Sequence, residues 1–153
     1  MKKWIKVLLC IVLAAVLAVG GYVAYVFIDY HRIGDMPLTP VQSADAAAAL
    51  ETDTPYAVLS WNIGFGAYES DYGFFMDGGK ESRARSAEAV DENMRGEASL
   101  VKALSPDFAL FQEVDIDGTR SWHIAEDAYL RDAMAGREFD EVYAQNYDSP
   151  YLF

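Results

Sequence analysis

Cysteine is nearly absent from this 153-residue sequence, which contains only Cys10. A single cysteine excludes an intrachain disulfide and a cysteine-rich zinc site. Cys10 lies inside an apolar N-terminal run, and residues 7–9 before it lack the small side chains expected at a lipoprotein cleavage site. We therefore interpret Cys10 as an apolar membrane-buried residue, with palmitoylation as the less favoured alternative.

Basic side chains are also few. The sequence contains 12 Lys and Arg and 24 Asp and Glu, which gives a formal net charge of −12. From residue 56 onward the counts are 8 and 19, so the acidity belongs to the C-terminal portion. Such a charge gives no general attraction to nucleic acid or to anionic lipid. Two interpretations stay open: simple solubility, or an acidic site that recruits a divalent cation to meet an anionic substrate.

Charge is missing altogether from residues 7–28, which follow a short segment with three lysines. At 1.5 Å per residue this run makes a helix of roughly 33 Å, enough to cross a hydrocarbon core of about 30 Å. Its length favours a retained single-pass anchor over residues 1–28, and small residues near Gly20 keep a cleaved signal peptide as the alternative. The preceding lysines predict a cytoplasmic N-terminus and an extracytoplasmic C-terminal domain at the cell membrane.

Residues 29–54 have no strong apolar period and contain several prolines and glycines. We expect a linker with one short helical turn at the alanines of residues 44–49. His31 and Arg32 lie beside the predicted membrane exit, where we interpret them as solvated or headgroup-facing rather than metal-binding.

Two apolar runs of similar shape each end in a polar residue. Residues 56–62 end in Asn62 and then break into glycines, and residues 107–114 contain Glu113 near their end. Each run is typical of a fully buried strand. A helix between the runs would make the strands parallel, with both C-terminal ends at one edge of the sheet. Open α/β sheets bind ligands at that edge.

The connecting segments fit this arrangement. Residues 63–85 form a long loop whose aromatic residues favour order, and its segment 78–80 lacks the full phosphate-loop spacing and is predicted to be a turn. Residues 86–104 predict a helix with Ser86 as N-cap and Pro106 beyond its end. Its apolar face comprises Val90, Met94, Val101 and Leu104.

The C-terminal region begins with a polar turn at residues 115–123. We predict a helix of about a dozen residues ending at Met134, with Gly136 as its C-terminal stop. Residues 138–146 alternate enough to predict a third strand. The chain ends on an apolar segment, residues 151–153, where another strand would begin, and we interpret residues 55–153 as a partial domain whose C-terminal half is missing.

Asn62 and Glu113 supply an amide oxygen and a carboxylate at one predicted sheet edge. Both are hard oxygen donors suited to Mg²⁺, with Mn²⁺ as an alternative. Taken singly, an Asn after a strand is usually a turn residue and a Glu there is usually solvated. Their matched placement favours a shared metal site.

The motifs that carry these residues, Ser-Trp-Asn-Ile at 60–63 and Phe-Gln-Glu-Val at 111–114, resemble the first two motifs of the endonuclease/exonuclease/phosphatase superfamily, which has the DNase I-like fold. The resemblance covers residues 56–153. It implies that Asn62 and Glu113 lie at the catalytic metal. It also implies an α/β fold, the N-terminal part of a four-layer sandwich with two facing sheets, preceded here by one transmembrane helix.

Two further segments, 119–121 and 146–148, look similar to substrate-side loops of membrane-anchored bacterial members. For Arg120 this implies a contact with phosphate, while a surface ion pair with Asp115 or Asp117 is an equal alternative. For His123 a surface position at the start of a helix is favoured. Family members also carry an Asp-x-Asn pair and a late Asp-His pair, and neither pair occurs in this sequence.

The function implied by the resemblance is Mg²⁺-dependent hydrolysis of a phosphodiester or phosphomonoester, nuclease- or phosphatase-like. The substrate would be nucleic acid, a phospholipid head group or a small phosphodiester, and no protein partner is implied. The alternative is a non-catalytic, membrane-tethered binding module that keeps the first half of the fold. A half domain is also expected to leave an apolar sheet face or strand edge uncovered.

Overall fold

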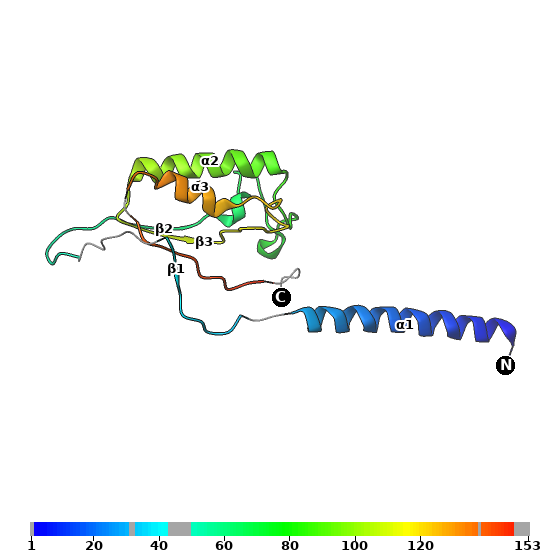
Figure 1. The fold of residues 1–153 in the computed structure, drawn as a ribbon. Helices are drawn as coiled ribbons and strands as arrows, with labels where there is room; N and C mark the ends of the chain where they lie inside the picture. The colour runs from blue at the N-terminus through cyan, green and yellow to red at the C-terminus, as the bar shows by residue number, and fades with distance from the viewer. Residues whose placement is uncertain (1, 31–32, 43–49, 138, 149–153) are drawn as a thin grey trace. The chain divides into compact units, whose positions relative to one another are not determined.

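The structure, a computed structural model, describes residues 2–30, 33–42, 50–137 and 139–148 (Figure 1). Along the chain the elements are α1 (Lys3–Asp29), β1 (Pro40–Gln42), β2 (Val58–Asn62), η1 (Gly64–Gly66), η2 (Phe75–Asp77), α2 (Ala87–Leu104), β3 (Phe108–Gln112), α3 (Glu126–Ala133) and β4 (Glu141–Val142). Residues 42–141 form one compact unit, and residues 1–41 with 142–153 form the other. The fold is of the mixed α/β type.

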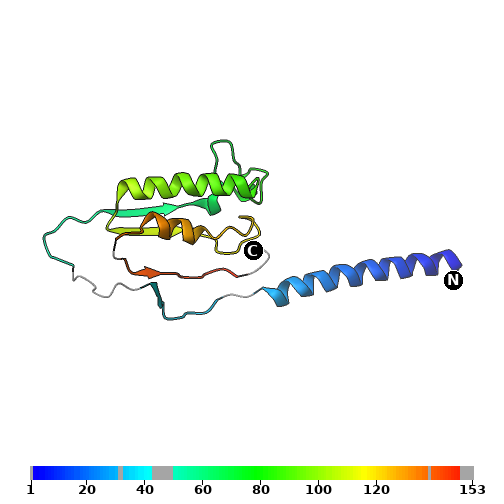
Figure 2. The same cartoon turned by 45° about the horizontal axis from the view of Figure 1, so that its top comes forward.

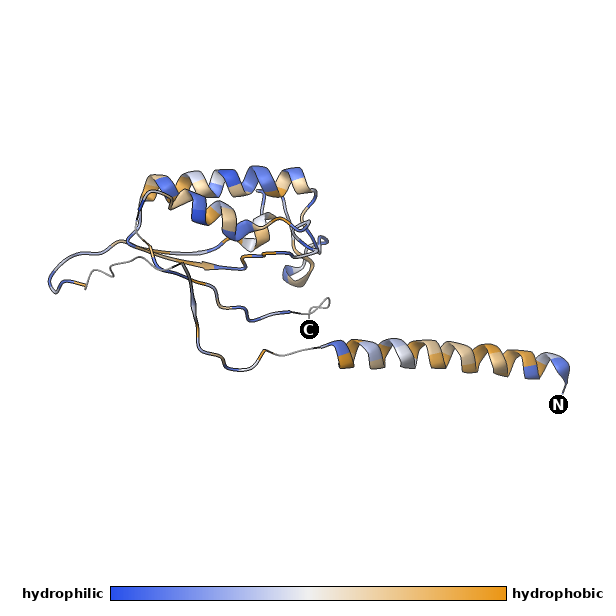
Figure 3. Ribbon diagram, in the orientation of Figure 1, coloured by the Kyte–Doolittle hydropathy of each residue, from blue (hydrophilic) through white to orange (hydrophobic). Residues whose placement is uncertain are grey.

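The N-terminal run forms the helix that its composition predicts. α1 spans 27 residues, and its apolar side chains are exposed along nearly its whole length. Much of its ribbon has the hydrophobic colour in Figure 3. Among the described residues it is the one helix long and apolar enough to cross a membrane, and a signal sequence has the same features. α1 is therefore consistent with a membrane anchor or a signal sequence.

The predicted third strand is wrong in length. β4 contains only residues 141–142, and it pairs with β1 rather than with β2 or β3. Val142 is exposed, and Phe139, Glu141 and Tyr143 are only half-buried, so no fully buried side chain holds a longer strand in register. Parts of four sequence predictions lie outside the described residues: His31 with Arg32, the alanines of 44–49, the first residue (138) of the predicted third strand, and the terminal residues 151–153.

β2 and β3 are parallel, as predicted, and α2 connects them. Their register pairs Val58 with Phe108 at one end and Asn62 with Gln112 at the other. In Figures 1 and 2 the helices α2 and α3 cover the same face of this two-stranded sheet. The core beneath them comprises Ile63, Phe65, Ala67, Ala84, Val90, Met94, Val101 and Leu130.

The two strands are not fully buried, which corrects the prediction made from their apolar runs. Exposed and half-buried residues alternate along both. Leu59, Trp61 and Phe111 pack against the core, whereas Val58 and Leu110 remain 64% and 52% exposed. The helices cover one face only, and the expected uncovered apolar sheet face is present.

Local sequence signals define α2 well. The Ser86 hydroxyl accepts a hydrogen bond from the Ala89 backbone N–H at 3.1 Å, which confirms it as the N-cap. Val90, Met94 and Val101 are completely buried. Leu104, which the apolar spacing assigns to the same face, is 54% exposed and lies outside the core. It is the last residue of the helix, and the left-handed C-cap that follows turns the chain away toward β3.

The loop after β2 is ordered by its aromatic residues, as expected. Phe65 is completely buried and makes edge contacts with the rings of Tyr68, Tyr72 and Phe74, at centroid distances of 6.0, 6.3 and 5.7 Å. Residues 78–80 form a turn in which Gly78 adopts a left-handed conformation.

The last helix is shorter than predicted. α3 has eight residues, because the segment before it forms a hydrogen-bonded loop that continues to residue 125. Met134 is its C-cap, and Gly136 follows at φ +87°, in the conformation expected of a glycine stop.

Candidate functional site

The two strands bring Asn62 and Glu113 together, as the sequence predicts. Asn62 is the last residue of β2, and Glu113 follows directly after β3. The parallel register places Asn62 opposite Gln112, and the Asn62 amide Nδ2 donates a hydrogen bond to the Glu113 carboxylate Oε1 at 2.9 Å. Both side chains lie at the C-terminal edge of the sheet.

The amide of Asn62 has a second partner. Its Oδ1 accepts a hydrogen bond from the Gly64 backbone N–H at 2.9 Å, which turns the chain from β2 into η1. The amide nitrogen therefore donates to Glu113, while the amide oxygen accepts from the backbone of Gly64. In this arrangement Asn62 orients the carboxylate and keeps one lone pair of Oδ1 for a further contact.

Glu113 and Phe65 hold left-handed backbone conformations, at φ +55° and +46°. The backbone N–H of Phe65 donates to the Glu113 carbonyl at 3.0 Å, and Ile63 donates to Gln112 at 3.0 Å, so the loop after β2 is tied to the end of β3. Non-glycine residues seldom adopt such conformations, and they cluster at functional sites. The carboxylate of Glu113 is thus presented by a constrained backbone.

Arg120 approaches Glu113 from the following loop. Its Nη1 donates to Glu113 Oε2 at 3.1 Å, and its Nε and Nη2 donate to the two carboxylate oxygens of Asp115 at 3.0 and 2.9 Å. The guanidinium carbon lies 4.1 Å from the centroid of the Phe65 ring. The predicted pair with Asp115 is present, and the one with Asp117 is not, since Asp117 contacts His123 instead.

The charges around Arg120 outweigh its partial burial. Burial acts to lower its pKa, but the hydrogen bonds and negative charges of Asp115 and Glu113 raise the pKa above its ordinary value. The side chain therefore keeps its charge next to Glu113. Three of the five guanidinium N–H groups have these carboxylate partners, which leaves two donors for another group.

A buried glutamate that sequence reasoning missed supports this loop. Glu126, at the start of α3, is 0% exposed. Its Oε2 accepts from the Asp115 N–H at 2.7 Å, and its own N–H donates to the Asp115 carbonyl at 3.0 Å. Burial raises the Glu126 pKa to about 8, while Oε1 has no partner among the described residues. A Glu in the first turn of a helix is usually solvated, so the sequence carries no signal for its burial.

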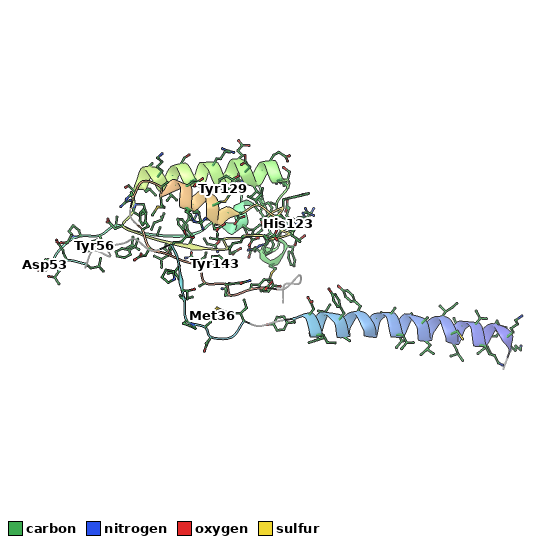
Figure 4. All side chains as sticks on the ribbon, viewed as in Figure 1. Met36, Asp53, Tyr56, His123, Tyr129 and Tyr143 are labelled. Atoms are coloured by element: carbon green, nitrogen blue, oxygen red, sulfur yellow. The ribbon has the colours of Figure 1, made fainter. Side chains whose placement is uncertain are left out.

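His123 pairs with Asp117 and not with Glu113. Its Nδ1 is 2.7 Å from Asp117 Oδ1, and its side chain is largely exposed just before α3, as expected for a surface histidine. Figure 4 places it at the end of the domain where the loops after the strands gather.

The groups at this edge that could hold a magnesium ion are the Glu113 carboxylate and the Asn62 amide oxygen. Each Glu113 oxygen accepts one hydrogen bond and keeps a second acceptor site. Mg²⁺ commonly uses one or two carboxylates and completes its shell with water and phosphate oxygens. Within the part of the chain that the structure describes, no cluster of three or more His, Cys, Asp or Glu side chains is placed to hold a metal.

Comparisons of the chain with protein-family models, with curated proteins and with solved structures found no match.

Proposed function

We propose that the chain carries a metal-dependent phosphoesterase site centred on Glu113. The observation that supports it is that the exposed Glu113 carboxylate is held from two sides, by hydrogen bonds from the Asn62 amide and the Arg120 guanidinium. Glu113 also has a left-handed backbone conformation, directly after the parallel strand β3. A structural ion pair would not need this backbone conformation, which costs about 1–2 kcal/mol for a non-glycine residue.

In this proposal Glu113 is the carboxylate ligand of Mg²⁺ or Mn²⁺, and Asn62 orients it and offers its remaining amide lone pair. The bound ion would supply Lewis-acid polarisation of the phosphoryl group. Arg120 holds Glu113 and directs its two remaining N–H groups to phosphoryl oxygens, where negative charge develops. The substrate class is a phosphate ester: nucleic acid, a phospholipid head group or a small phosphodiester.

The wider architecture belongs to the same proposal. α1 would be a single-pass anchor with a cytoplasmic N-terminus, and residues 55–153 would supply the first part of a two-sheet sandwich of the endonuclease/exonuclease/phosphatase type. The apolar face of the β2–β3 sheet would then be the surface that meets the second sheet.

One observation favours a non-catalytic binding module instead. Asp115 neutralises Arg120 through two hydrogen bonds, so much of the positive charge beside Glu113 is already compensated. In that alternative the site would bind a ligand without hydrolysing it.

Titration of the full chain with Mg²⁺, followed by tryptophan fluorescence, tests the metal site. Trp61 precedes Asn62 on β2 and reports on the sheet edge. We expect a saturable change in the wild type that Glu113→Ala abolishes and that Glu92→Ala, at an exposed glutamate of α2, retains. A response that does not depend on Glu113 contradicts the proposal. Hydrolysis of bis(p-nitrophenyl) phosphate that requires Glu113 would separate the enzyme from the binding module.

A further inference from the structure

Arg83 differs from the other described arginines of the compact unit. Arg85, Arg95, Arg120, Arg131 and Arg137 each lie within 4.0 Å of at least one carboxylate. Within the described residues Arg83 has no such partner. Its guanidinium carbon instead lies over the Trp122 ring, 3.6 Å from the centroid. In a domain with a large acidic excess, this uncompensated guanidinium is unusual.

Stacking on an indole leaves the hydrogen-bonding edge of a guanidinium available. The ring faces the π-surface of the cation, and the N–H groups point outward in its plane, in the fork geometry that matches a phosphoryl group. A guanidinium already held on a ring also has less conformational freedom to lose when it binds an anion. Arg83 is thus an exposed guanidinium that is preorganised to donate hydrogen bonds to an anion.

Hydrogen bonds attach the Arg83 segment to the loop that carries Arg120. The Ala84 N–H donates to the Arg120 carbonyl at 2.8 Å, and the Trp122 indole Nε1 donates to the Ala84 carbonyl at 2.7 Å. Ala84 is 1% exposed, so the junction is buried. Arg83 is therefore fixed next to the same loop that reaches Glu113.

The backbone of that loop supports a specific placement of the indole. Trp122 and His123 are consecutive non-glycine residues in left-handed conformations, at φ +58° and +60°. Such residues persist only where surrounding contacts determine them, and they are concentrated at functional sites. The conformation presents Trp122 to both Arg83 and Ala84.

We propose that Arg83, stacked on Trp122, is a second phosphate-binding residue of the candidate site, beside Arg120, and takes a non-bridging oxygen of a phosphate ester. Arg120 holds Glu113 and contributes its two remaining N–H groups to the same phosphate. This assignment rests on the proposed function for the location of the reacting group, although the anion site itself needs no metal. The shared chemistry is the phosphoryl group of a lipid head group or of a mononucleotide.

Equilibrium dialysis of the full chain in neutral detergent with labelled inorganic phosphate tests the assignment, with Mg²⁺ in one series and EDTA in the other. We expect Arg83→Ala to weaken phosphate binding about tenfold or more in both series, because hydrogen bonds to a charged partner are lost. Arg83→Lys keeps the positive charge but lacks the fork of N–H groups, so its affinity for phosphate should lie between those of the wild type and Arg83→Ala. Arg95→Ala is the matched control, since Arg95 also lies over a ring, that of Tyr129, but is paired with Asp91.

The outcomes separate this inference from the metal site. Loss of phosphate binding in Arg83→Ala but not in Arg95→Ala supports the role of Arg83. This result is independent of Mg²⁺, so it stands even if the Mg²⁺ titration contradicts the metal site. Absence of phosphate binding by the wild type, equal losses in the two alanine variants, or full affinity in Arg83→Lys would overturn the role of Arg83. Competition by glycerol 3-phosphate against a mononucleotide then identifies the source of the phosphate, and Arg83-dependent competition by either one supports the assignment.

Discussion

At the scale of single residues, the candidate site depends on backbone conformations that are costly. Glu113 and Phe65 are left-handed, and each such non-glycine residue costs about 1–2 kcal/mol. The hydrogen bonds between the loop after β2 and the end of β3 offset this cost, together with the ring contacts of the buried Phe65. The carboxylate is consequently held in place by the fold before any ligand arrives.

Gly64 is the residue on which this turn depends most directly. Its φ is +57°, and a Cβ there would lie 2.3 Å from the Tyr68 ring. We expect Gly64→Ala to destabilise the fold by more than about 1 kcal/mol, because both the backbone and the ring must shift. Urea unfolding of the full chain in detergent, followed by tryptophan fluorescence, measures this change.

The matched control is Gly96→Ala in the middle of α2, where a Cβ would meet nothing within 4 Å. It should stabilise the helix by about 0.5–1 kcal/mol. Equal effects of the two substitutions would contradict the role given to Gly64.

At the scale of elements, α2 and α3 are stabilised in different ways. α2 has a side-chain N-cap, an acidic first turn and Lys102 in its last turn. α3 has no side-chain cap, and the exchange of hydrogen bonds between Glu126 and Asp115 takes its place. The start of α3 is thereby linked to the loop that contains Arg120, so packing of α3 contributes to the geometry of the site.

Packing predicts a large difference between two apolar residues of α2. Met94 is completely buried, whereas Leu104 is more than half exposed. Met94→Ala should cost about 2–5 kcal/mol of unfolding free energy, and Leu104→Ala well under half of that. The same urea titration compares them. A cost for Leu104→Ala as large as that for Met94→Ala would show that another surface covers the end of α2.

At the scale of the whole molecule, the buried Glu126 and the half-buried Glu97 differ from the exposed carboxylates of the described residues. Burial raises the pKa of Glu97 to about 7 and that of Glu126 to about 8. For Glu126 the Asp115 and Glu97 charges add to this, while the Asp115 N–H and Arg120 act against it. Glu126 is therefore mainly protonated in the folded chain at neutral pH, and Glu97 is about half protonated there.

These shifts predict that stability falls as the pH rises. A carboxyl group whose folded pKa exceeds its unfolded value stabilises the fold fully below the unfolded pKa, and loses that contribution as the pH passes its folded pKa. The loss is up to about 1.4 kcal/mol per pH unit for each proton. Thermal unfolding midpoints should fall between about pH 5 and pH 8 in the wild type. Glu126→Gln should flatten this dependence.

Glu92→Gln, at an exposed position of α2, is the control and should leave the slope unchanged. Below about pH 4 the sign reverses, because Arg95 and Tyr129 hold the pKa of Asp91 below its ordinary value and that contribution is lost on protonation. A flat profile in the wild type above pH 5 would contradict the buried protonated state of Glu126.

Local patterns in the sequence were sufficient for the elements that depend on periodicity. The apolar spacing of residues 90–101 and the Ser86 cap predicted α2, and the parallel register then brought Asn62 to Glu113. These inferences hold because helix period and capping are set by neighbouring residues, and a helical crossover between two strands makes them parallel. The uncharged run of residues 7–28 predicted α1 for the same reason.

Only the tertiary structure decided the surroundings of the site. The apolar runs could not show that β2 and β3 bury one face each, since every position in them is compatible with burial. The stacking of Arg83 on Trp122 joins loops that are distant in sequence. The contacts of Arg120 and the burial of Glu126 depend on the path of the loop between β3 and α3, for which the sequence carries no signal. Such contacts depend on where the packed helices place those loops. The sequence alone therefore determined which strands carry Asn62 and Glu113, and the fold determined which charges surround them.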